Sequence, residues 1–356
     1  MEVPQPTAQP RRRRPVWPAI LVGAVGQIVL ICLFATLVSQ FASTHVRSYV
    51  HNFAAKTSAH VCPQAKPTDA VPHDSTGQFT IQPVYAEVLT YARDAAGQPA
   101  SQRVHLWDVD VLGQYPPMDD IFTNAVGGVD VWNTALRASS PAEFRCVVAD
   151  MQTSAVEARA LTVLQLAAKE LAGPTTTAYL VPWYTTRFYG ASGEKSLLIP
   201  FWEQAPLDRT LERNAATDWF YMPEALNHEY FEVVRYDRLG SLDNAYQNLL
   251  GNIVTDGLAD NFAAHMTNAP LRDRGISPDE EATLWQRFQP DLTSDTNQNE
   301  ASEMLGDPTQ NIPNGAGYAI GDHIVSLYLR KHPDVTFSQL AGMDAQTIFD
   351  GSGYNG

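Results

Sequence analysis

The segment M-P-E-A-L-N-H-E-Y-F-E-V-V-R at residues 222–235 carries the strongest structural signal in this chain. Its apolar residues recur at three- and four-residue spacing, which predicts an amphipathic helix. His228 and Glu232 stand four positions apart, so both side chains leave the same side of that helix. Glu229 lies to one side of them. An imidazole and two carboxylates in this arrangement are typical of a metal site whose neighbouring acid accepts a proton.

A second helix is predicted by the segment I-V-T-D-G-L-A-D-N-F-A-A-H-M at residues 253–266. Asp256 and Asp260 are again four positions apart and share one side of the helix. One of these acids is able to complete the metal site, while the other hydrogen-bonds the far nitrogen of His228 and fixes its tautomer. Gly257 lies beside them and allows two helices to approach closely.

The charge of the chain argues against nucleic-acid binding. The formal net charge is −15, and residues 1–42 contain four Arg and one Glu, which leaves 20 basic and 38 acidic residues in the remainder. Sequence-independent binding to nucleic acid needs a basic surface that displaces counterions, so we expect no nucleic-acid partner. The sequence also contains no G-x-S-x-G elbow, phosphate-binding loop or C-x-x-C motif, and serine hydrolase, nucleotide and thiol-redox functions therefore lack support.

The N-terminal part of the sequence predicts a membrane anchor. Four arginines, Arg11 to Arg14, precede Ala19–Val38, which is apolar apart from Gln27 and Thr36. Twenty such residues span about 30 Å as a helix, enough to cross the core of a bilayer. The positive charge before the span places the N-terminus in the cytoplasm and the rest of this single-pass chain outside the cell membrane. The alternative is a cleaved signal peptide, although the apolar core of such a peptide is usually shorter.

These features divide the chain into five parts. A basic cytoplasmic N-terminus and a transmembrane signal anchor precede a stalk or linker rich in proline, and the remainder forms the extracytoplasmic domain. The boundaries are residues 1–15 for the N-terminus, 16–41 for the anchor, 42–77 for the stalk, 78–150 for the first part of the domain and 151–356 for its second part.

The three cysteines follow this division. Cys32 lies in the predicted span, where it acts as a small apolar residue, whereas Cys62 and Cys146 lie on the extracytoplasmic side. Disulfides persist in that compartment. We hypothesise a bridge between Cys62 and Cys146, which would tie the stalk to the first part of the domain. Two free thiols are the alternative.

Periodicity predicts a mainly helical domain with a few strands. Alternation of apolar and acidic residues predicts a half-buried strand at His105–Leu112, and the polar composition of residues 291–316 predicts a long loop beside the site, with a lid as one interpretation. Ser277 before Pro278 predicts the start of a helix. The other expected elements are helices at residues 84–93, 129–138, 152–172, 222–235, 241–266 and 317–332, short helical pieces at 336–349, and strands at Ala178–Trp183 and Ser196–Trp202.

The two helical segments resemble those of one protein family. L-N-H-E-Y-F-E-V-V-R followed by D-G-L-A-D-N-F-A is similar to the H-E-Y-x-H and E-G-L-A-D helices of a bacterial family of predicted zinc-dependent proteases. The segments G-Y-A-I-G-D-H-I-V at residues 317–325 and I-F-D-G-S-G-Y at residues 348–354 are also similar to that family. The family in turn resembles thermolysin-like zinc peptidases of the gluzincin type.

The resemblance implies a role for each candidate residue. His228 matches the first metal ligand and Glu229 the general base, while Asp260 matches the acid that supports a ligand from behind. Glu232 stands where the family has its second His, and Asp256 stands where it has Glu. Two of the three implied ligands thus depart from the family pattern, although carboxylates also bind metals.

These departures affect the expected metal and function. A site with one imidazole and two carboxylates is harder than the usual zinc set, so besides Zn it should accept Mn or Fe. The resemblance implies a membrane-anchored metalloprotease, a hydrolase that cleaves a peptide or protein substrate. The alternative is a catalytically inactive relative that binds a peptide or protein in the same cleft. Glu229 favours the enzyme, because a binding module needs no proton acceptor.

Residues near the two helices have more than one interpretation. Tyr318 and His323 lie on the helix expected at residues 317–332 and are candidates to stabilise an oxyanion, with ordinary packing as the alternative. Arg235 either neutralises Glu232 or forms a solvent-facing ion pair. The expected fold class is α+β and mostly helical, and the resemblance implies a zincin-like fold with a small β-sheet, preceded by one transmembrane helix.

Overall fold

The computed structural model describes residue 74 and residues 76–124, 133–134, 136–183, 190–201, 222–294 and 296–356. All of them belong to one compact unit that extends from Cys62 to Gly356. The expected anchor at residues 16–41 lies outside the described residues. Among the helices that the structure describes, none combines the length and the apolar character needed to cross a membrane.

A four-stranded sheet forms the centre of the first half of the unit, and its strand order is β1-β2-β4-β3. The strands are β1 (Phe79–Pro83), β2 (Thr176–Pro182), β3 (Ala191–Gly193) and β4 (Ser196–Phe201). The first three neighbours in the sheet are parallel, and the short edge strand β3 is antiparallel to β4. The structure confirms the strands expected at residues 178–183 and 196–202. It adds β1, through which the segment 78–150 shares a sheet with the rest of the domain.

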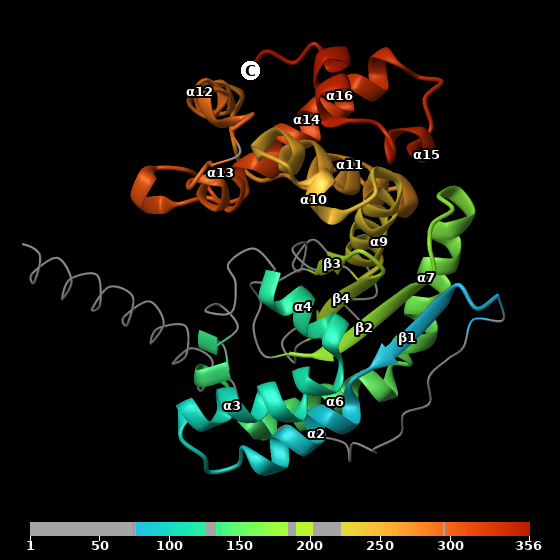
Figure 1. The fold of residues 1–356 in the computed structure, drawn as a ribbon, viewed down its shortest axis with the longest axis vertical. Coiled ribbons are helices and arrows are strands. Elements are labelled where there is room, and N and C mark those ends of the chain that lie inside the picture. The colour runs from blue at the N-terminus through green and yellow to red at the C-terminus, as the bar shows by residue number, and fades with distance from the viewer. Residues whose placement is uncertain are drawn as a thin grey trace, which may run out of the picture. The chain divides into compact units, whose positions relative to one another are not determined.

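Helices cover both faces of this sheet (Figure 1). Two of them, α2 and α6, pack against β2 on one side, while α7 packs against β1 and α9 against β3 and β4 on the other. Nearly all side chains of β2 and β4 are consequently buried. The helices of this half are α2 (Tyr85–Asp94), α3 (Ala100–Asp110), α4 (Pro116–Asn124), α6 (Pro141–Thr153) and α7 (Val156–Glu170), with one 3-10 turn, η1 (Leu112–Gln114).

The strand expected at His105–Leu112 was wrong, because this segment belongs to α3 and η1. Trp107 and Val111 are buried and stand one helical turn apart, whereas Val109 between them is 50% exposed. The apolar residues therefore do not share one face, as a half-buried strand requires. Trp107 packs edge-on against Tyr91 at a centroid distance of 5.1 Å. This contact anchors the helix.

The second half of the unit is helical. The predicted helix at residues 222–235 is confirmed and runs one turn further, while the helix expected at 241–266 is divided in two, because Asn248 caps a new helix by accepting a hydrogen bond from the Gly251 N–H. The loop expected at residues 291–316 contains two short helices, so that expectation was partly wrong. The elements are α9 (Met222–Leu239), α10 (Leu242–Ala245), α11 (Leu249–Thr267), α12 (Pro278–Phe288), η3 (Gln289–Asp291), α13 (Glu300–Leu305), η4 (Pro308–Gln310), α14 (Ala316–Lys331), α15 (Phe337–Leu340) and α16 (Ala345–Ser352).

Helix α9 is buried on every side. Figure 1 shows it between the sheet and the C-terminal helices, and every residue from 225 to 236 is buried. The sequence pattern indicated an apolar stripe and a polar face, and a polar face normally meets water. Here the polar face meets α11 instead. The charged side chains of Glu229, Glu232 and Arg235 are thus enclosed within the protein.

A close contact of two glycines sets the spacing of α11 and α14. A β-carbon built at Gly257 would collide with the backbone of Gly321, and one built at Gly321 would collide with the carbonyl of Ile253. The two helix backbones therefore touch where neither has a side chain. Asp256 precedes Gly257, and Asp322 follows Gly321. The crossing of the two helices therefore also places these acidic side chains near one another. The described part of the chain is a mostly helical α+β fold.

Replacing Gly257 by Ala should destabilise the protein, since α11 and α14 would have to separate. We expect the free energy of unfolding to fall by about 1–3 kcal/mol, the usual cost of overpacking a close contact. Urea unfolding followed by circular dichroism measures this. Gly342→Ala is the matched control, because its added methyl group makes only ordinary contacts, the nearest at 3.8 Å. Equal stability of the two variants would contradict the proposed role of the crossing.

Candidate metal centre

Three side chains from two helices converge on one point. The Nε2 atom of His228 lies 3.5 Å from Oε1 of Glu232 on the same helix, α9. It lies 3.7 Å from Oδ1 of Asp256 on α11. One ligand atom from each residue can be chosen such that all three lie within 4.8 Å of one another, and all three residues are buried. The candidate ligands expected from the sequence are therefore brought together.

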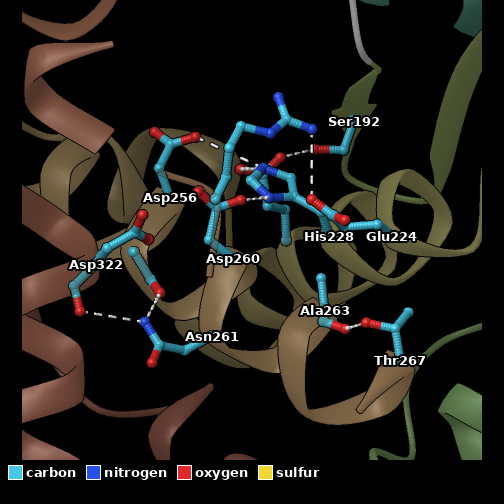
Figure 2. A network of polar contacts seen from close by, with 12 residues as sticks. Ser192, Glu224, His228, Asp256, Asp260, Asn261, Ala263, Thr267 and Asp322 are labelled. Carbon is cyan, nitrogen blue, oxygen red and sulfur yellow. Dashed lines mark hydrogen bonds and ion pairs between the residues drawn. The ribbon is translucent and has the colours of Figure 1, made fainter. Parts of the chain in front are cut away.

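The other nitrogen of His228 is held from behind. Its Nδ1 atom lies 2.8 Å from Oδ1 of Asp260 (Figure 2). The second oxygen of Asp260 accepts a hydrogen bond from Nη2 of Arg274. With the proton on Nδ1 donated to Asp260, the lone pair of Nε2 faces Glu232 and Asp256. This is the tautomer that a metal-binding imidazole needs.

The surroundings of His228 carry a surplus of negative charge. We call the five carboxylates gathered here the acidic cluster. Opposite them stand His228 and one guanidinium, that of Arg274, which bonds Asp260 and lies 3.7 Å from Asp322. Water cannot screen these charges well, because the side chains are only 3–14% exposed. The acidic cluster consists of Glu229, Glu232, Asp256, Asp260 and Asp322.

The pKa values of the cluster reflect this surplus. Burial raises the pKa of Asp256 to about 7, and burial together with the charge of Asp260 raises the pKa of Asp322 well above its usual value. Burial lowers the pKa of His228, but the carboxylates around it outweigh burial and hold that pKa well above 6.5. Asp260 is different, because Arg274 and His228 overcome the effect of burial and lower its pKa. Several of these groups therefore keep protons that a bound cation would displace.

The donor set fits a small divalent cation. Four ligands arranged tetrahedrally at typical zinc distances lie about 3.4 Å from one another. The two measured separations from Nε2 of His228, 3.5 and 3.7 Å, are close to this value. A lone pair directed at two carboxylates is unfavourable unless a proton or a cation lies between them. His228, Glu232 and Asp256 would hold such an ion, with Asp260 fixing the imidazole.

Glu229 lies beside the three candidate ligands. It is 3% exposed, and among the described residues its Oε2 atom has no hydrogen-bond partner. Burial and the charge of Glu232 raise the pKa of Glu229 well above its usual value. Gly190 packs against it so closely that a β-carbon there would lie 2.5 Å from Oε1. A buried carboxylate with one unbonded oxygen next to a candidate metal site is suited to accept a proton.

Glu232 is held by three hydroxyl groups that the sequence did not point to. Ser192 of β3 donates to Oε2 at 2.5 Å, and Tyr236 donates to the same oxygen at 3.1 Å. Tyr246, which follows α10, donates to Oε1 at 2.7 Å. Burial raises the pKa of Glu232, but the hydrogen bonds and charge of His228 and these hydroxyls lower it overall. Of the two candidate carboxylate ligands, Glu232 is therefore the one that more readily stays ionised.

The two expected oxyanion donors occupy different places. Tyr318 lies at the site, since Arg274 stacks 4.6 Å from the centre of its ring and, after burial, the charge of Asp256 is the main cause of its raised pKa. His323 points elsewhere: its Nδ1 atom lies 2.7 Å from the carboxylate of Glu281 on α12, and its side chain is 58% exposed. The structure therefore brings only Tyr318 to the candidate metal centre.

Arg235 serves the fold: its burial excludes the solvent-facing ion pair, whereas its charge is attracted to that of Glu232, as the first interpretation expected. Its side chain is 1% exposed and donates to Oγ1 of Thr255 at 2.9 Å and to the carbonyl oxygens of Leu340 and Met343 at 3.2 and 2.9 Å. It thus ties α9 to α11 and to the chain around α15. Burial lowers the pKa of Arg235 to about 10, which leaves it charged at neutral pH.

Cys146 lies on α6 and is disulfide-bonded. Cys62, its hypothesised partner, lies outside the described residues, as does Cys32. The pairing with Cys62 therefore stays a prediction.

Sequence reasoning missed several residues of the site. Tyr236 stands four residues after Glu232 on the same helix, so helical spacing could have indicated it. Ser192, Tyr246, Arg274 and Asp322 reach the site from other elements, and no motif marks them. Asp322 lies next to the glycine crossing, but its direction depends on the rotation of α14, which sequence alone does not give.

The family comparison concerns the helical half of the chain. The model of a family described as "Predicted Zn-dependent protease (DUF2268)" matches residues 210–350, less than half of the sequence. The match spans all three candidate ligands and Glu229. This part of the chain is therefore similar to predicted zinc proteases. No curated protein and no solved structure matched.

The hydrogen bond between His323 and Glu281 should make a pH-dependent contribution to the stability of the folded protein. The hydrogen bond to Glu281 raises the pKa of His323, so the contribution is fully present below pH 6.5 and is lost as the pH rises through the raised value. We expect the unfolding midpoint of His323→Gln to lie below that of the unchanged protein at pH 5.5 and to approach it at pH 9. Thermal unfolding at a series of pH values measures this. The exposed residue His105, changed to Gln, is the control, and a difference independent of pH would contradict the assignment.

Proposed function

We propose that this chain is a metal-dependent peptidase with a zincin-like domain. One observation carries the proposal: His228, Glu232 and Asp256 offer ligand atoms within 4.8 Å of one another, and beside them lies Glu229, whose Oε2 atom has no hydrogen-bond partner among the described residues. The similarity of residues 210–350 to predicted zinc proteases supports zinc as the metal. The two carboxylate ligands make Mn or Fe acceptable as well.

The chemistry follows from the positions of the side chains. A divalent ion held by His228, Glu232 and Asp256 supplies Lewis-acid chemistry, which polarises a peptide carbonyl and lowers the pKa of a nearby water molecule. Glu229 accepts a proton from that water while the oxygen of the water bonds to the carbonyl carbon of the substrate. When the carbon–nitrogen bond breaks, Glu229 gives this proton to the departing amine. The products are a carboxylate and an amine.

Other residues support this reaction without changing covalently. Asp260 keeps the Nδ1 proton of His228 in place, and Arg274 holds Asp260 in turn. The phenol of Tyr318 is a candidate donor to the negative oxygen that develops on the substrate carbonyl. Glu229, whose pKa is raised by burial and by the charge of Glu232, would become available as a base if a cation were bound beside it.

A metal and hydrolysis measurement on the purified full-length chain tests this function. Mass spectrometry should find about one divalent ion per chain, and His228→Ala should abolish its binding. Glu229→Gln should keep the ion but lower kcat/KM for an unstructured protein such as casein by about 100-fold or more, since a general base contributes 10²–10⁴-fold. Chelation should stop hydrolysis, and addition of Zn²⁺ or Mn²⁺ should restore it.

Matched controls separate these effects from general damage. His265→Ala removes an exposed imidazole from α11, and Asp237→Asn removes an exposed acid from α9; neither should alter metal content or hydrolysis. Hydrolysis that survives unchanged in Glu229→Gln would refute the peptidase. A chain that binds metal and casein without hydrolysing it would be an inactive relative that acts as a peptide-binding module.

The location of the activity is part of the proposal. Residues 16–41 anchor the chain in the cell membrane, the N-terminus lies in the cytoplasm and the described domain acts on peptide or protein substrates outside the cytoplasm. The arginines before the apolar span support this orientation.

Protease treatment of intact spheroplasts tests the orientation. The domain should be digested, and the protein should stay with the membrane after extraction at high pH. The span-deleted chain, lacking residues 1–42, is the control and should not sediment with membranes. Protection of the domain in intact spheroplasts would contradict the orientation.

A further inference from the structure

Glu232 sits in a cage of hydroxyl groups that comes from three separate elements. We define the hydroxyl cage as Ser192 of β3, Tyr236 of α9 and Tyr246 between α10 and α11. The three groups also contact one another, with 2.8 Å between the oxygens of Ser192 and Tyr236 and 3.1 Å between those of the two tyrosines. A surface acid would need none of these partners. The cage is therefore built around a carboxylate.

The hydrogen bonds of the cage leave one direction open. A carboxylate has about four lone-pair positions, two on each oxygen. Ser192 and Tyr236 bond Oε2, and Tyr246 takes one position on Oε1. The remaining lone pair is on Oε1, the oxygen that lies 3.5 Å from Nε2 of His228. The cage thus leaves free the electron pair that faces the candidate metal position.

We propose that Ser192, Tyr236 and Tyr246 are positioning residues that fix Glu232 as a single-oxygen metal ligand, so that this site requires a carboxylate at position 232. The inference rests on the metal site of the proposed function. The cage prevents rotation of the carboxylate and satisfies its second oxygen, as partners behind a ligand do in metal sites generally. Because it favours an oxygen ligand, it also raises the affinity for Mn²⁺ relative to Zn²⁺.

An imidazole at position 232 would not satisfy the cage. A neutral imidazole has one acceptor nitrogen, which the metal would occupy, and one N–H group. The three hydroxyls would then face a donor instead of two acceptor oxygens. Only two contacts join the hydroxyls to one another, so at least one of their three protons would lose its acceptor, and a buried hydroxyl without an acceptor is costly. Glu232→His, which completes an H-E-x-x-H sequence, should therefore weaken metal binding while the hydroxyl cage is present.

Metal affinity of the full-length chain tests the cage without any measurement of hydrolysis. Titration of metal-free protein with Zn²⁺ and Mn²⁺ gives both dissociation constants. Tyr246→Phe and Ser192→Ala should each weaken binding by about 10-fold or more, as losses behind a ligand typically do. Ser192→Thr, which keeps the hydroxyl, should bind the metal about as tightly as the unchanged chain. Tyr230→Phe is the matched control, because it removes a buried hydroxyl from α9 that bonds the carbonyl of Leu171 instead of Glu232.

A second comparison excludes a purely structural effect. In Glu232→His combined with Tyr236→Phe and Tyr246→Phe, Zn²⁺ should bind at least about 10-fold more tightly than in Glu232→His alone, because the hydroxyls that oppose the imidazole are gone. If the unchanged chain binds metal and the cage variants bind it equally well, the cage has no positioning role and only this inference fails. If the unchanged chain binds neither ion, the inference and the metal site of the proposed function fail together.

Discussion

The bond between His228 and Asp260, backed by Arg274, is the interaction on which the candidate metal centre depends. It fixes which nitrogen of the imidazole carries the proton, and so decides that Nε2 faces Glu232 and Asp256. Buried charges are costly unless they are paired. Arg274 pairs with Asp260 and Asp322, but among the described residues no guanidinium forms an ion pair with Glu229, Glu232 or Asp256. The remaining carboxylates must share protons or bind a cation.

The fold provides this enclosure by burying a helix on all sides. Helix α9 lies between the sheet and α11, so its polar face points into the protein and can present ligands at fixed positions. Two devices hold the surrounding helices in register. The contact of Gly257 with Gly321 sets the distance between α11 and α14, and the buried guanidinium of Arg235 links α9 to α11 and to the chain near α15. Neither the glycine crossing nor the hydrogen bonds of Arg235 involve the side chain of a candidate ligand, yet both determine where the ligands lie.

Sequence reasoning reached the parts of this arrangement that depend on helical spacing alone. Two pairs of candidate residues, His228 with Glu232 and Asp256 with Asp260, stand four residues apart on one helix each, and geometry within one helix is regular. The strand wrongly expected around Trp107 shows the limit, since alternation over a few residues also fits a helix that buries every fourth residue. Contacts between elements depend on helix rotation and loop path. These are set by tertiary packing, which local patterns do not encode.

The two residues that depart from the expected H-E-Y-x-H and E-G-L-A-D pattern have different structural settings. Asp256 has a shorter side chain than the Glu expected at this position. It reaches the site from α11, whose backbone contacts that of α14 at the glycine crossing. At Glu232 the surroundings themselves suit a carboxylate, because three hydroxyls donate to its oxygens. A residue left over from a decayed site would not need donors on both oxygens, and an exposed acid would find water instead. The hydroxyl cage therefore argues that the carboxylate at position 232 is kept for its oxygen, which is the property that a metal ligand requires.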